Sequence, residues 1–445
     1  AKNKGKTFTT DTLLEWVRRQ EWVSGLIERT LTTNYRSTGE TARMAWKIRK
    51  DVLSGLEASP ESLQKLQGFV SSLREVGSGI KPGDELSRPS HKTVCVLCRS
   101  NGEVLQLASL LSLKEVNYYL KPRPEDSGLP PWLGRVLGTY SSRHISSSEF
   151  VNRWKDLIRL ESQPEPLAAW EWLKRVEGLE RTDLDVREVH KQFYRGQSLP
   201  DDADAFLSGD QNGISISTVH AVKGREFDQV VILQPEQSGG IDQVDNSLEE
   251  ARVLYVAATR ARRELARLGR TGLPKMWVVD CPGGRRRWVA RQQASRCYFM
   301  EVGLSGDVDA CSPVSTFVHP DLNTARTAQD LLWSGIGQDT RLYIYRITTG
   351  NYTFYRIACK QVASEKTVDL AQLSLPIIKD MALIQSKVSN GKPVWLPKYW
   401  DNLRVAATVT EILPPYPEHV FEPYATSGFC LGLRIRGMDF IYKER

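Results

Sequence analysis

Two apolar segments joined by a polar loop constrain the fold of this chain most strongly. The stretch Ile216–Phe227 begins with β-branched residues, as a buried strand would, and continues as a polar loop. The run Asp228–Leu233 that follows is rich in Val and Ile, which is typical of strands buried on both faces of a parallel sheet. Loops at strand ends bind ligands in open α/β sheets. The sequence therefore predicts a parallel α/β sheet with a ligand-binding loop.

A helix is expected after this strand, over Glu249–Arg262. Its apolar stripe, suited to docking on the sheet, consists of Val253, Leu254, Val256 and Ala257. Polar residues recur on the same helix at a spacing of three to four, namely Arg252, Tyr255, Thr259 and Arg262. We expect Arg260, near the end of the stretch, to contact a phosphate.

These two stretches closely resemble motifs V and VI of the UvrD/Rep/PcrA group of superfamily 1 DNA helicases, whose patterns are Thr-x-His-x-x-Lys-Gly-Leu-Glu-Phe and Tyr-Val-Ala-x-Thr-Arg-Ala. Leu31–Thr38 contains Asn-Tyr-Arg-Ser, the core of motif IV, and Val94–Leu111 resembles motif IVa. The four motifs stand in the order of the family. The resemblance implies a RecA-like motor domain that belongs to an ATP-dependent DNA helicase or translocase, active in repair, recombination or phage defence.

The resemblance also implies a nucleotide site. Tyr35 would stack on adenine, and Glu226 would accept a hydrogen bond from the ribose. Arg36 and Arg260 would act as arginine fingers that stabilise negative charge during phosphoryl transfer. Gly224 would let the backbone approach the ligand closely. These five residues are the expected catalytic and cofactor-binding set.

Single-stranded or partly duplex DNA is the implied substrate. Thr218 and His220 of motif V would contact its backbone, and Arg99 and Asn101 of motif IVa would do the same. A structural role stays open for all four, since a histidine at a strand end often only satisfies local hydrogen bonds. The family usually has Leu where this chain has Arg225, which adds charge beside the nucleotide.

A structural role also stays open for motif IV. Ser37 or Thr38 could cap a following helix, expected over Thr41–Val52, while the Tyr35 ring packs in the core. Residues 8–25 carry apolar side chains at helical spacing and would precede motif IV as the end of a first motor domain.

ATP and Mg²⁺ are the implied cofactors, although their main binding motifs are incomplete here. Gly5-Lys6-Thr7 resembles only the tail of a phosphate-binding loop, no strand precedes it, and no acidic magnesium motif follows before Tyr35. We therefore expect the phosphate loop and the magnesium ligands in a first motor domain, in the same or another chain. This chain alone would then lack ATPase activity. Alternatives are a non-catalytic DNA-binding or scaffold subunit of a repair or anti-phage complex, and a relative that acts on RNA.

The motif positions predict four parts of the chain. They are the end of the first motor domain or a linker at 1–30, a RecA-like domain at 31–115 and 211–272, a mainly helical insertion at 116–210, and a smaller mainly β domain at 273–445. In the insertion, Ser147–Leu160 and Leu167–Val176 have the spacing of helices.

The C-terminal part has the alternation of strands. Arg341–Thr348 and Tyr352–Ala358 flank a Gly-Asn turn and predict a hairpin, and Val405–Leu413 and Phe429–Ile441 predict further strands. This part resembles no family that we recognise. We expect it to bind a protein partner or nucleic acid.

Composition limits the remaining possibilities. The seven cysteines are an odd, scattered set, which favours reduced thiols, and Cys95-x-x-Cys98 lies within a strand-like run without a second pair to complete a metal site. No long apolar run or secretory signal is present, so we expect a cytoplasmic, or nuclear, protein without a membrane segment. Between Ala266 and Met300 basic residues alternate with Trp277 and Trp288, which suits phosphate contacts or, alternatively, a solvated basic loop.

Overall fold

The computed structural model describes most of the chain from residue 60 onward. The described residues are 16, 19, 60–76, 93–113, 116, 118–120, 128–158, 164–196, 213–234, 247–270, 273–292, 295–334, 336–337, 340–350, 352–361, 366–391 and 396–443. The expected helices at 8–25 and Thr41–Val52 and motif IV, with Tyr35 and Arg36, lie outside this set, apart from isolated positions.

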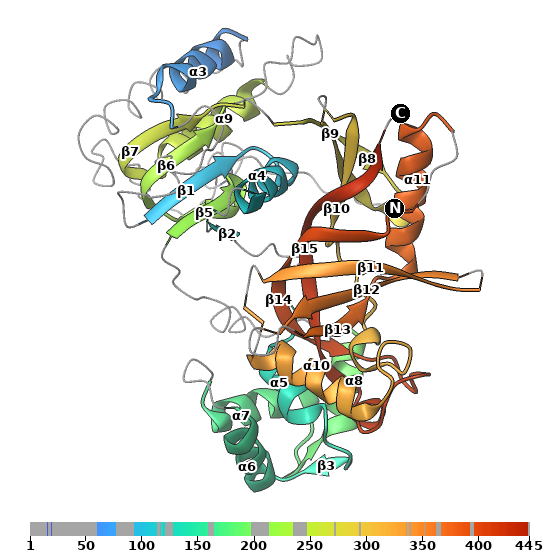
Figure 1. Cartoon of the computed structure of the whole chain (residues 1–445). Helices are drawn as coiled ribbons and strands as arrows, with labels where there is room; N and C mark the ends of the chain where they lie inside the picture. The colour runs from blue at the N-terminus through green and yellow to red at the C-terminus, as the bar shows by residue number, and fades with distance from the viewer. Residues whose placement is uncertain are drawn as a thin grey trace.

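A parallel sheet forms the first unit of the fold (Figure 1). Its strand order is β2-β5-β1-β6-β7, and each neighbouring pair is parallel. The strands are β1 (Thr93–Cys98), β2 (Tyr118–Leu120), β5 (Gly213–Thr218), β6 (Phe227–Leu233) and β7 (Ala261–Leu268). The RecA-like α/β fold expected from the sequence is confirmed. Strand β2 belongs to this sheet although its residues follow the expected boundary at 115.

Helices cover both faces of the parallel sheet, which explains why its strands are apolar on both sides. Helix α4 (Asn101–Leu113) packs on one face, where Leu107 joins the cluster of Val96 and Ile216. Helices α3 (Pro60–Ser72) and α9 (Ser247–Ala258) lie on the other. There Ala257 packs with Cys95 and Val230.

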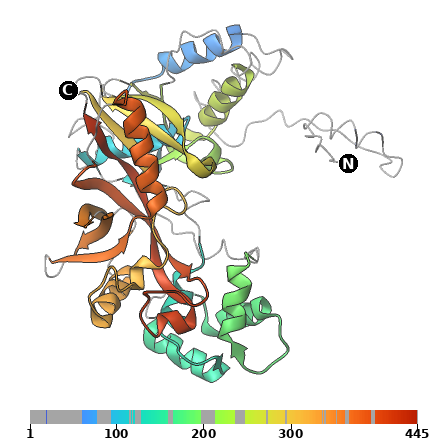
Figure 2. The same ribbon diagram turned by 90° about the vertical axis from the view of Figure 1, so that its right-hand side faces the viewer.

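The second unit is an antiparallel sheet with strand order β13-β12-β11-β14-β15-β10-β9-β8. Its strands are β8 (Lys275–Asp280), β9 (Arg286–Gln292), β10 (Cys297–Val302), β11 (Arg341–Thr349), β12 (Tyr352–Lys360), β13 (Thr367–Gln372), β14 (Tyr399–Ile412) and β15 (Phe429–Lys443). The predicted hairpin is confirmed as β11 and β12, with Gly350 at φ 59° in the turn. The two further predicted strands are confirmed as β14 and β15. Helices α10 (Leu322–Ser334) and α11 (Leu375–Val388) bury its core (Figure 2).

The insertion is a compact helical unit. It contains α5 (Pro131–Leu137), α6 (Ser147–Leu157), α7 (Pro166–Glu177), α8 (Val186–Tyr194) and a two-stranded sheet of β3 (His144–Ile145) and β4 (Leu184–Asp185). Both helices predicted from the sequence are confirmed as α6 and α7. Trp132, Trp154 and Trp172 form its core with edge and tilted ring contacts. Four short helices complete the described elements: η3 (His220–Val222), η5 (Pro282–Gly284), η6 (Ser312–Val314) and α12 (Tyr424–Ser427).

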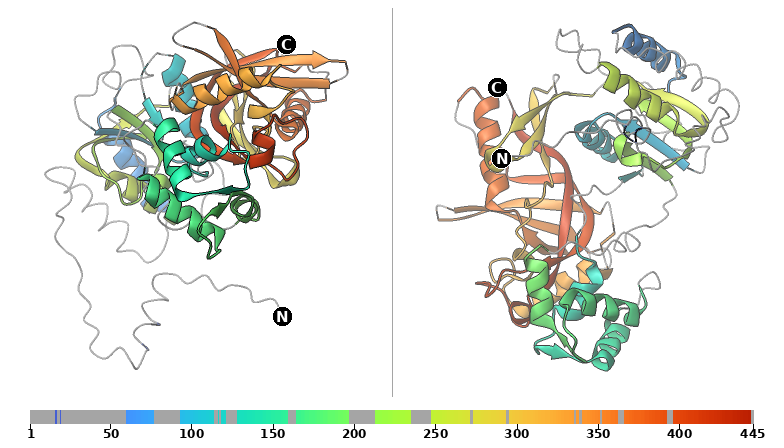
Figure 3. Two further views of the ribbon diagram at one scale, coloured as in Figure 1. Left: turned by 90° about the horizontal axis from the view of Figure 1, so that it is seen from below. Right: turned by 180° about the vertical axis from the view of Figure 1, so that it is seen from behind.

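The insertion packs on the antiparallel sheet, as Figure 3 shows from two sides. Phe429 of β15 belongs to the insertion's core cluster. The Thr410 hydroxyl of β14 accepts a hydrogen bond of 2.8 Å from the Gly134 amide and donates one of 2.6 Å to the Pro130 carbonyl. The insertion is therefore attached to the β-rich unit by buried polar and apolar contacts.

The β-rich unit also contacts the RecA-like unit, through helix α4 and strand β2. The Trp288 ring lies so close to Gly102 that a Cβ atom at residue 102 would come within 2.5 Å of it. The Asn402 amide donates a 2.9 Å hydrogen bond to the Ser109 hydroxyl, and Arg436 donates one of 2.9 Å to the Leu120 carbonyl. These contacts join the two sheets.

In the described part of the chain, no helix combines the length and apolarity needed to cross a membrane.

Candidate functional site

The motif V segment crosses the parallel sheet from one edge to the other. Strand β5 ends at Thr218 and β6 begins at Phe227, and both run parallel to β1 between them. The connection must therefore return from the carboxyl edge to the amino edge, about 20 Å for strands of this length. Val219 and Val222 anchor it in the buried cluster on one face. Residues of a single motif are thus divided between opposite edges of the sheet.

The expected DNA-contacting residues meet at the carboxyl edge. Thr218 pairs with Cys98, the last residue of β1, so Arg99 follows at the same level. The Arg99 Nη1 and His220 Nε2 atoms are 3.5 Å apart. The Thr218 hydroxyl accepts a hydrogen bond of 3.4 Å from the Ala221 amide, which fixes the turn that carries His220. Asn101 is exposed at the first position of α4.

A capping box positions Arg99 and Asn101. The Glu103 amide donates to the Ser100 hydroxyl over 3.3 Å, and Glu103 Oε2 accepts from the Ser100 amide at 3.1 Å. The same oxygen accepts from the Arg99 amide at 2.7 Å, while Arg270 holds Oε1 at 2.6 Å. We did not single out Glu103 or Arg270 as supports of this edge from the sequence, although the Ser-x-x-Glu spacing was a usable signal.

The nucleotide residues of motifs V and VI lie together at the amino edge. The Phe227 amide donates to the Arg260 carbonyl over 3.0 Å, which joins the start of β6 to the start of β7. Glu226 forms an ion pair of 3.1 Å with Arg262. Gly224 is exposed, has φ +88°, and would have no atom within 4 Å of an added Cβ. The backbone there is accessible in a conformation that suits glycine.

Arg260 is 8% exposed and its guanidinium is bonded within its own domain. Nε donates to the Val256 carbonyl at 3.1 Å, Nη2 to the Thr259 hydroxyl at 3.2 Å, and Nη1 to the Arg225 carbonyl at 3.4 Å. These acceptors orient the side chain at the end of α9.

The structure corrects the extent of the motif VI helix. It ends at Ala258, where the Arg260 amide donates to the Ala257 carbonyl in a tight final turn. Strand β7 begins at Ala261, so Arg262 is on a strand and not on the predicted helical stripe. The sheet, and not helical spacing, brings Arg262 to Glu226.

Residues 148–267 match the family model of the UvrD-like helicase C-terminal domain. This part of the chain is a UvrD-like helicase C-terminal domain. The matched segment contains motifs V and VI. Of the expected site residues that the structure describes, it includes all except Arg99 and Asn101. The family match indicates that this domain has a role of the superfamily 1 helicase type. Helicases of this family depend on nucleotide and act on DNA. No curated protein matches the chain.

Most of the arginines between Ala266 and Met300 form ion pairs with carboxylates, so the predicted basic surface for phosphate is largely wrong. Trp277 packs at 6.2 Å from Tyr298, whereas Trp288 faces α4, and their register places them on opposite faces of the sheet. The ion pairs are Arg267 with Glu75, Arg270 with Glu103, Arg285 with Asp380, Arg286 with Asp280, and Arg287 with Asp307 and Asp380.

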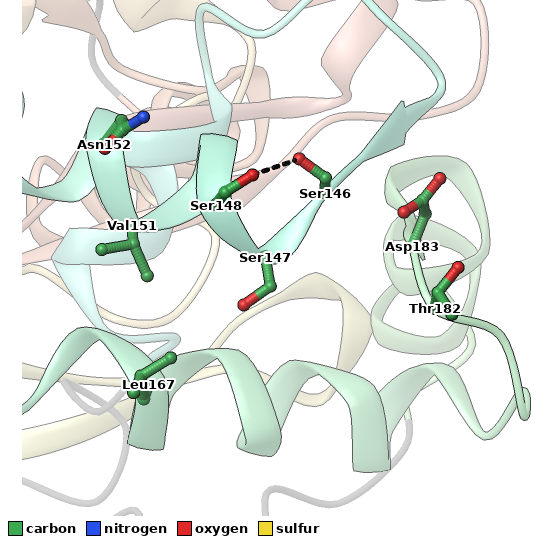
Figure 4. A pocket seen from close by; sticks show the side chains of 8 residues that line it. All are labelled: Ser146, Ser147, Ser148, Val151, Asn152, Leu167, Thr182 and Asp183. Carbon is green, nitrogen blue, oxygen red and sulfur yellow. Dashed lines mark hydrogen bonds between the residues drawn. The ribbon is translucent and has the colours of Figure 1, made fainter.

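A pocket of about 610 Å³ opens beside α6, away from both edges of the parallel sheet (Figure 4). None of the expected site residues contributes to it. Ser146 caps α6 by accepting from the Glu149 amide at 3.2 Å, which accounts for one of its polar groups. The pocket is lined by Ser146, Ser147, Ser148, Val151, Asn152, Leu167, Thr182 and Asp183.

The cysteine pair of strand β1 is structural in the parallel sheet. Cys95 and Cys98 are fully buried, and burial raises the pKa of the Cys98 thiol well above its usual range. Among the described residues no group of three or more His, Cys, Asp and Glu side chains could hold a metal ion.

Proposed function

We propose that this chain supplies the second half of an ATP-dependent DNA helicase or translocase. It would close on nucleotide held by a first motor domain, in the same or another chain, and move single-stranded or partly duplex DNA. The observation that carries the proposal is the division of the motif residues between two edges of the sheet. Arg99 and His220 lie at one edge, and Glu226 and Arg260 lie at the other. A coupling motor needs separate nucleotide and DNA contacts on one rigid element.

The amino edge fits a nucleotide. Gly224 leaves an open approach to the backbone, Glu226 supplies a carboxylate acceptor for ribose hydroxyls, and Arg260 supplies a cation. Arg36 and Tyr35, which lie outside the described residues, would add a second arginine finger and a stacking ring. ATP would supply the free energy of phosphoryl transfer, and the arginines would stabilise the charge that develops on it.

Magnesium does not fit this chain in the same way. The described residues contain no cluster of acidic or metal-ligating side chains, so we assign no residue to the metal and derive no step from it. Its ligands are proposed to belong to the first motor domain.

The carboxyl edge fits a nucleic-acid backbone. Arg99 and Asn101 are exposed at the start of α4, and His220 is exposed on the adjoining turn. Cationic and amide donors of this kind position phosphates without reading sequence. We propose that these residues and Thr218 follow single-stranded DNA, with the protein acting in the cytoplasm or, in a eukaryote, the nucleus.

The state of Arg260 favours one alternative. An arginine finger must extend across a cleft, whereas this guanidinium is buried and bonded to Val256, Thr259 and Arg225. Leaving three such acceptors costs on the order of 1 kcal/mol each. A non-catalytic scaffold subunit that binds DNA and keeps Arg260 as a structural residue is therefore the second candidate.

A measurement of ATP hydrolysis stimulated by single-stranded DNA distinguishes the motor from the non-catalytic scaffold. The assay would use the protein together with its first motor domain and compare wild type, Arg260→Ala and Arg263→Ala. Arg263 lies three residues further along, with a side chain 72% exposed, and controls for loss of a nearby positive charge. The motor predicts a loss of at least about 10³-fold in turnover for Arg260→Ala alone. No turnover in wild type would favour the scaffold, and equal turnover in the three proteins would show that Arg260 is not an arginine finger.

A further inference from the structure

The β11–β12 hairpin has an unusual composition. Residues 341–361 include Arg341, Arg346, Arg356 and Lys360, and no aspartate or glutamate. The same segment holds five aromatic residues: Tyr343, Tyr345, Tyr352, Phe354 and Tyr355. Its positive charge is therefore not balanced within the hairpin. The motor function described above uses none of these residues.

Strand alternation sorts these side chains onto two faces. Leu342, Ile344 and Tyr355 are fully buried in the core of the β-rich unit. The alternate positions face outward, and cross-strand partners share a face, so Tyr345 lies with Arg356 and Ile347 with Phe354. Strand β14 extends the same face, because Tyr399 pairs with Tyr345. The outward face combines aromatic rings with basic groups.

Two rings of this face are exposed to solvent. Tyr352 is 71% exposed and Tyr399 is 68% exposed. The rings of Tyr352 and Phe354 are 6.4 Å apart and inclined by only 27°, so they present stacked planes along one strand. Figure 1 shows the hairpin extending beyond the rest of the sheet. Exposed rings on a protruding β-hairpin expose a large apolar area to water unless they have a ligand.

The cations of this face surround a third ring. The Arg341 guanidinium lies 5.7 Å, and the Lys360 ammonium 5.6 Å, from the centre of the Tyr343 ring. Two acids of neighbouring strands in the described part of the chain, Asp401 and Asp369, are engaged by groups of this face. Asp401 pairs with Arg341 at 2.6 Å, and Asp369 accepts the Tyr345 hydroxyl at 2.8 Å. Lys360 thus adds positive charge beside the aromatic rings.

We propose that this outward face, the hairpin platform of Arg341, Tyr345, Tyr352, Phe354, Lys360 and Tyr399, binds single-stranded nucleic acid. Unpaired bases can stack on exposed rings, whereas the bases of a duplex are covered by one another. The basic groups match the phosphate backbone and make the surface less suited to a neutral or basic protein partner. The charge and the rings together select an unpaired strand.

The platform is separate from the motor edge. It is formed by β11, β12 and β14. Helix α4 of the motor contacts the same sheet at Trp288 on β9, Met438 on β15 and Asn402 on β14, and these three residues are not part of the platform. The two surfaces would hold different parts of a strand, or two strands. The inference therefore stands whether or not the chain hydrolyses ATP.

Fluorescence anisotropy with a labelled oligothymidylate tests the platform. The whole chain would carry Arg99→Ala and His220→Ala, which remove contacts at the motor edge. In this background the pair Tyr352→Ala and Tyr399→Ala is expected to weaken binding at least about 25-fold, since each base stacked on a ring contributes about 1–3 kcal/mol. The control is Tyr416→Ala, since Tyr416 is 96% exposed but lies outside the hairpin. It should bind as the background protein does.

Two further measurements complete the test. Lys360→Gln should lower the salt dependence of the affinity by about one unit of slope. Ultraviolet cross-linking to a halogenated oligonucleotide should label peptides that contain Tyr352 or Tyr399. Unchanged affinity in the tyrosine pair, or equal affinity for duplex and single-stranded DNA, would overturn the proposal.

Discussion

Arg99 Nη1 lies 3.5 Å from His220 Nε2, although 121 positions separate the two residues in the chain. The contact exists because β1 and β5 are parallel neighbours that end at the same level. It joins motif IVa to motif V in one polar strip beside the first turn of α4. Motifs IVa and V, which are far apart in the sequence, therefore form one surface.

Single-strand binding should therefore depend on both residues together. Arg99→Ala and His220→Ala are each expected to weaken the affinity of the chain for single-stranded DNA by about tenfold. The double variant should lose less than the product of the two, because each residue supports the position of the other. Titrations of the four proteins measure this coupling. Strictly multiplicative losses would show that the two side chains act independently.

Arg270 is predicted to support that surface without touching DNA. It holds Glu103 at 2.6 Å, and Glu103 in turn accepts the amides of Arg99 and Ser100. Arg270→Ala should reduce single-strand affinity by a factor of about three to ten and weaken the cap of α4. The control is Arg286→Ala, which removes an exposed arginine paired with Asp280. If both variants bind equally well, Arg270 has no positioning role.

The buried ion cluster of the β-rich unit should dominate its stability. Arg287 is 0% exposed and binds Asp307 at 2.5 Å and Asp380 at 2.8 Å. Arg287→Ala leaves the buried Asp307 carboxylate without its cation and Asp380 with Arg285 alone, and should lower the free energy of unfolding by about 3–5 kcal/mol. Arg286→Ala, at the neighbouring exposed position, should change it by less than about 1 kcal/mol. Urea denaturation measures both, and similar midpoints would contradict the assignment.

Because the two units are in contact at α4, substitution by alanine should have opposite effects on stability at two helical glycines, Gly102 and Gly68. Gly102→Ala would place a Cβ atom 2.5 Å from the Trp288 ring and 2.8 Å from Met276, so it should destabilise by about 1–3 kcal/mol. Gly68, also within a helix, has no atom within 4 Å of such a Cβ. Gly68→Ala should therefore stabilise slightly, by up to about 1 kcal/mol. Thermal denaturation of the two variants tests this prediction. An increase in melting temperature for both would contradict the close packing at Gly102.

Asp439 should make stability depend on pH. Burial, assisted by Asp401, raises the pKa of this carboxyl from its usual value to about 6, even though the amides of Asn402 and Phe440 donate to it. Because the folded pKa exceeds the unfolded one, the stabilisation is complete below about pH 4 and is lost as pH rises through 6. The stability of wild type relative to Asp439→Asn should fall by about 3 kcal/mol over this range. A constant difference would mean that the carboxyl is already ionised at the lower pH.

The sequence anticipated those features that local patterning determines. The β-branched runs around motif V predicted buried strands, and the turn at Gly350 predicted the β11–β12 hairpin. The end of α9 escaped prediction because helical spacing continues past Ala258, whereas pairing of Ala261 with Phe227 draws the chain into the sheet.

The wrong prediction of a basic surface is explained by ion-pair partners that are distant in the sequence. The arginines near Arg287 formed a basic run in sequence, but their counterions Asp307 and Asp380 come from later segments. Charge in a linear sequence does not reveal such pairing. For the same reason, the separation of Arg260 from His220 could be known only from strand register.

Separation of function at the two edges tests the central claim most directly. The measurement is ATP hydrolysis against single-stranded DNA concentration, for the protein with its first motor domain, in wild type, Arg99→Ala and Arg260→Ala. The account predicts that Arg99→Ala raises the DNA concentration needed for stimulation and keeps DNA-independent turnover, whereas Arg260→Ala abolishes turnover and keeps DNA affinity. Loss of both properties together in either variant would contradict a motor domain with its nucleotide and DNA contacts on opposite edges.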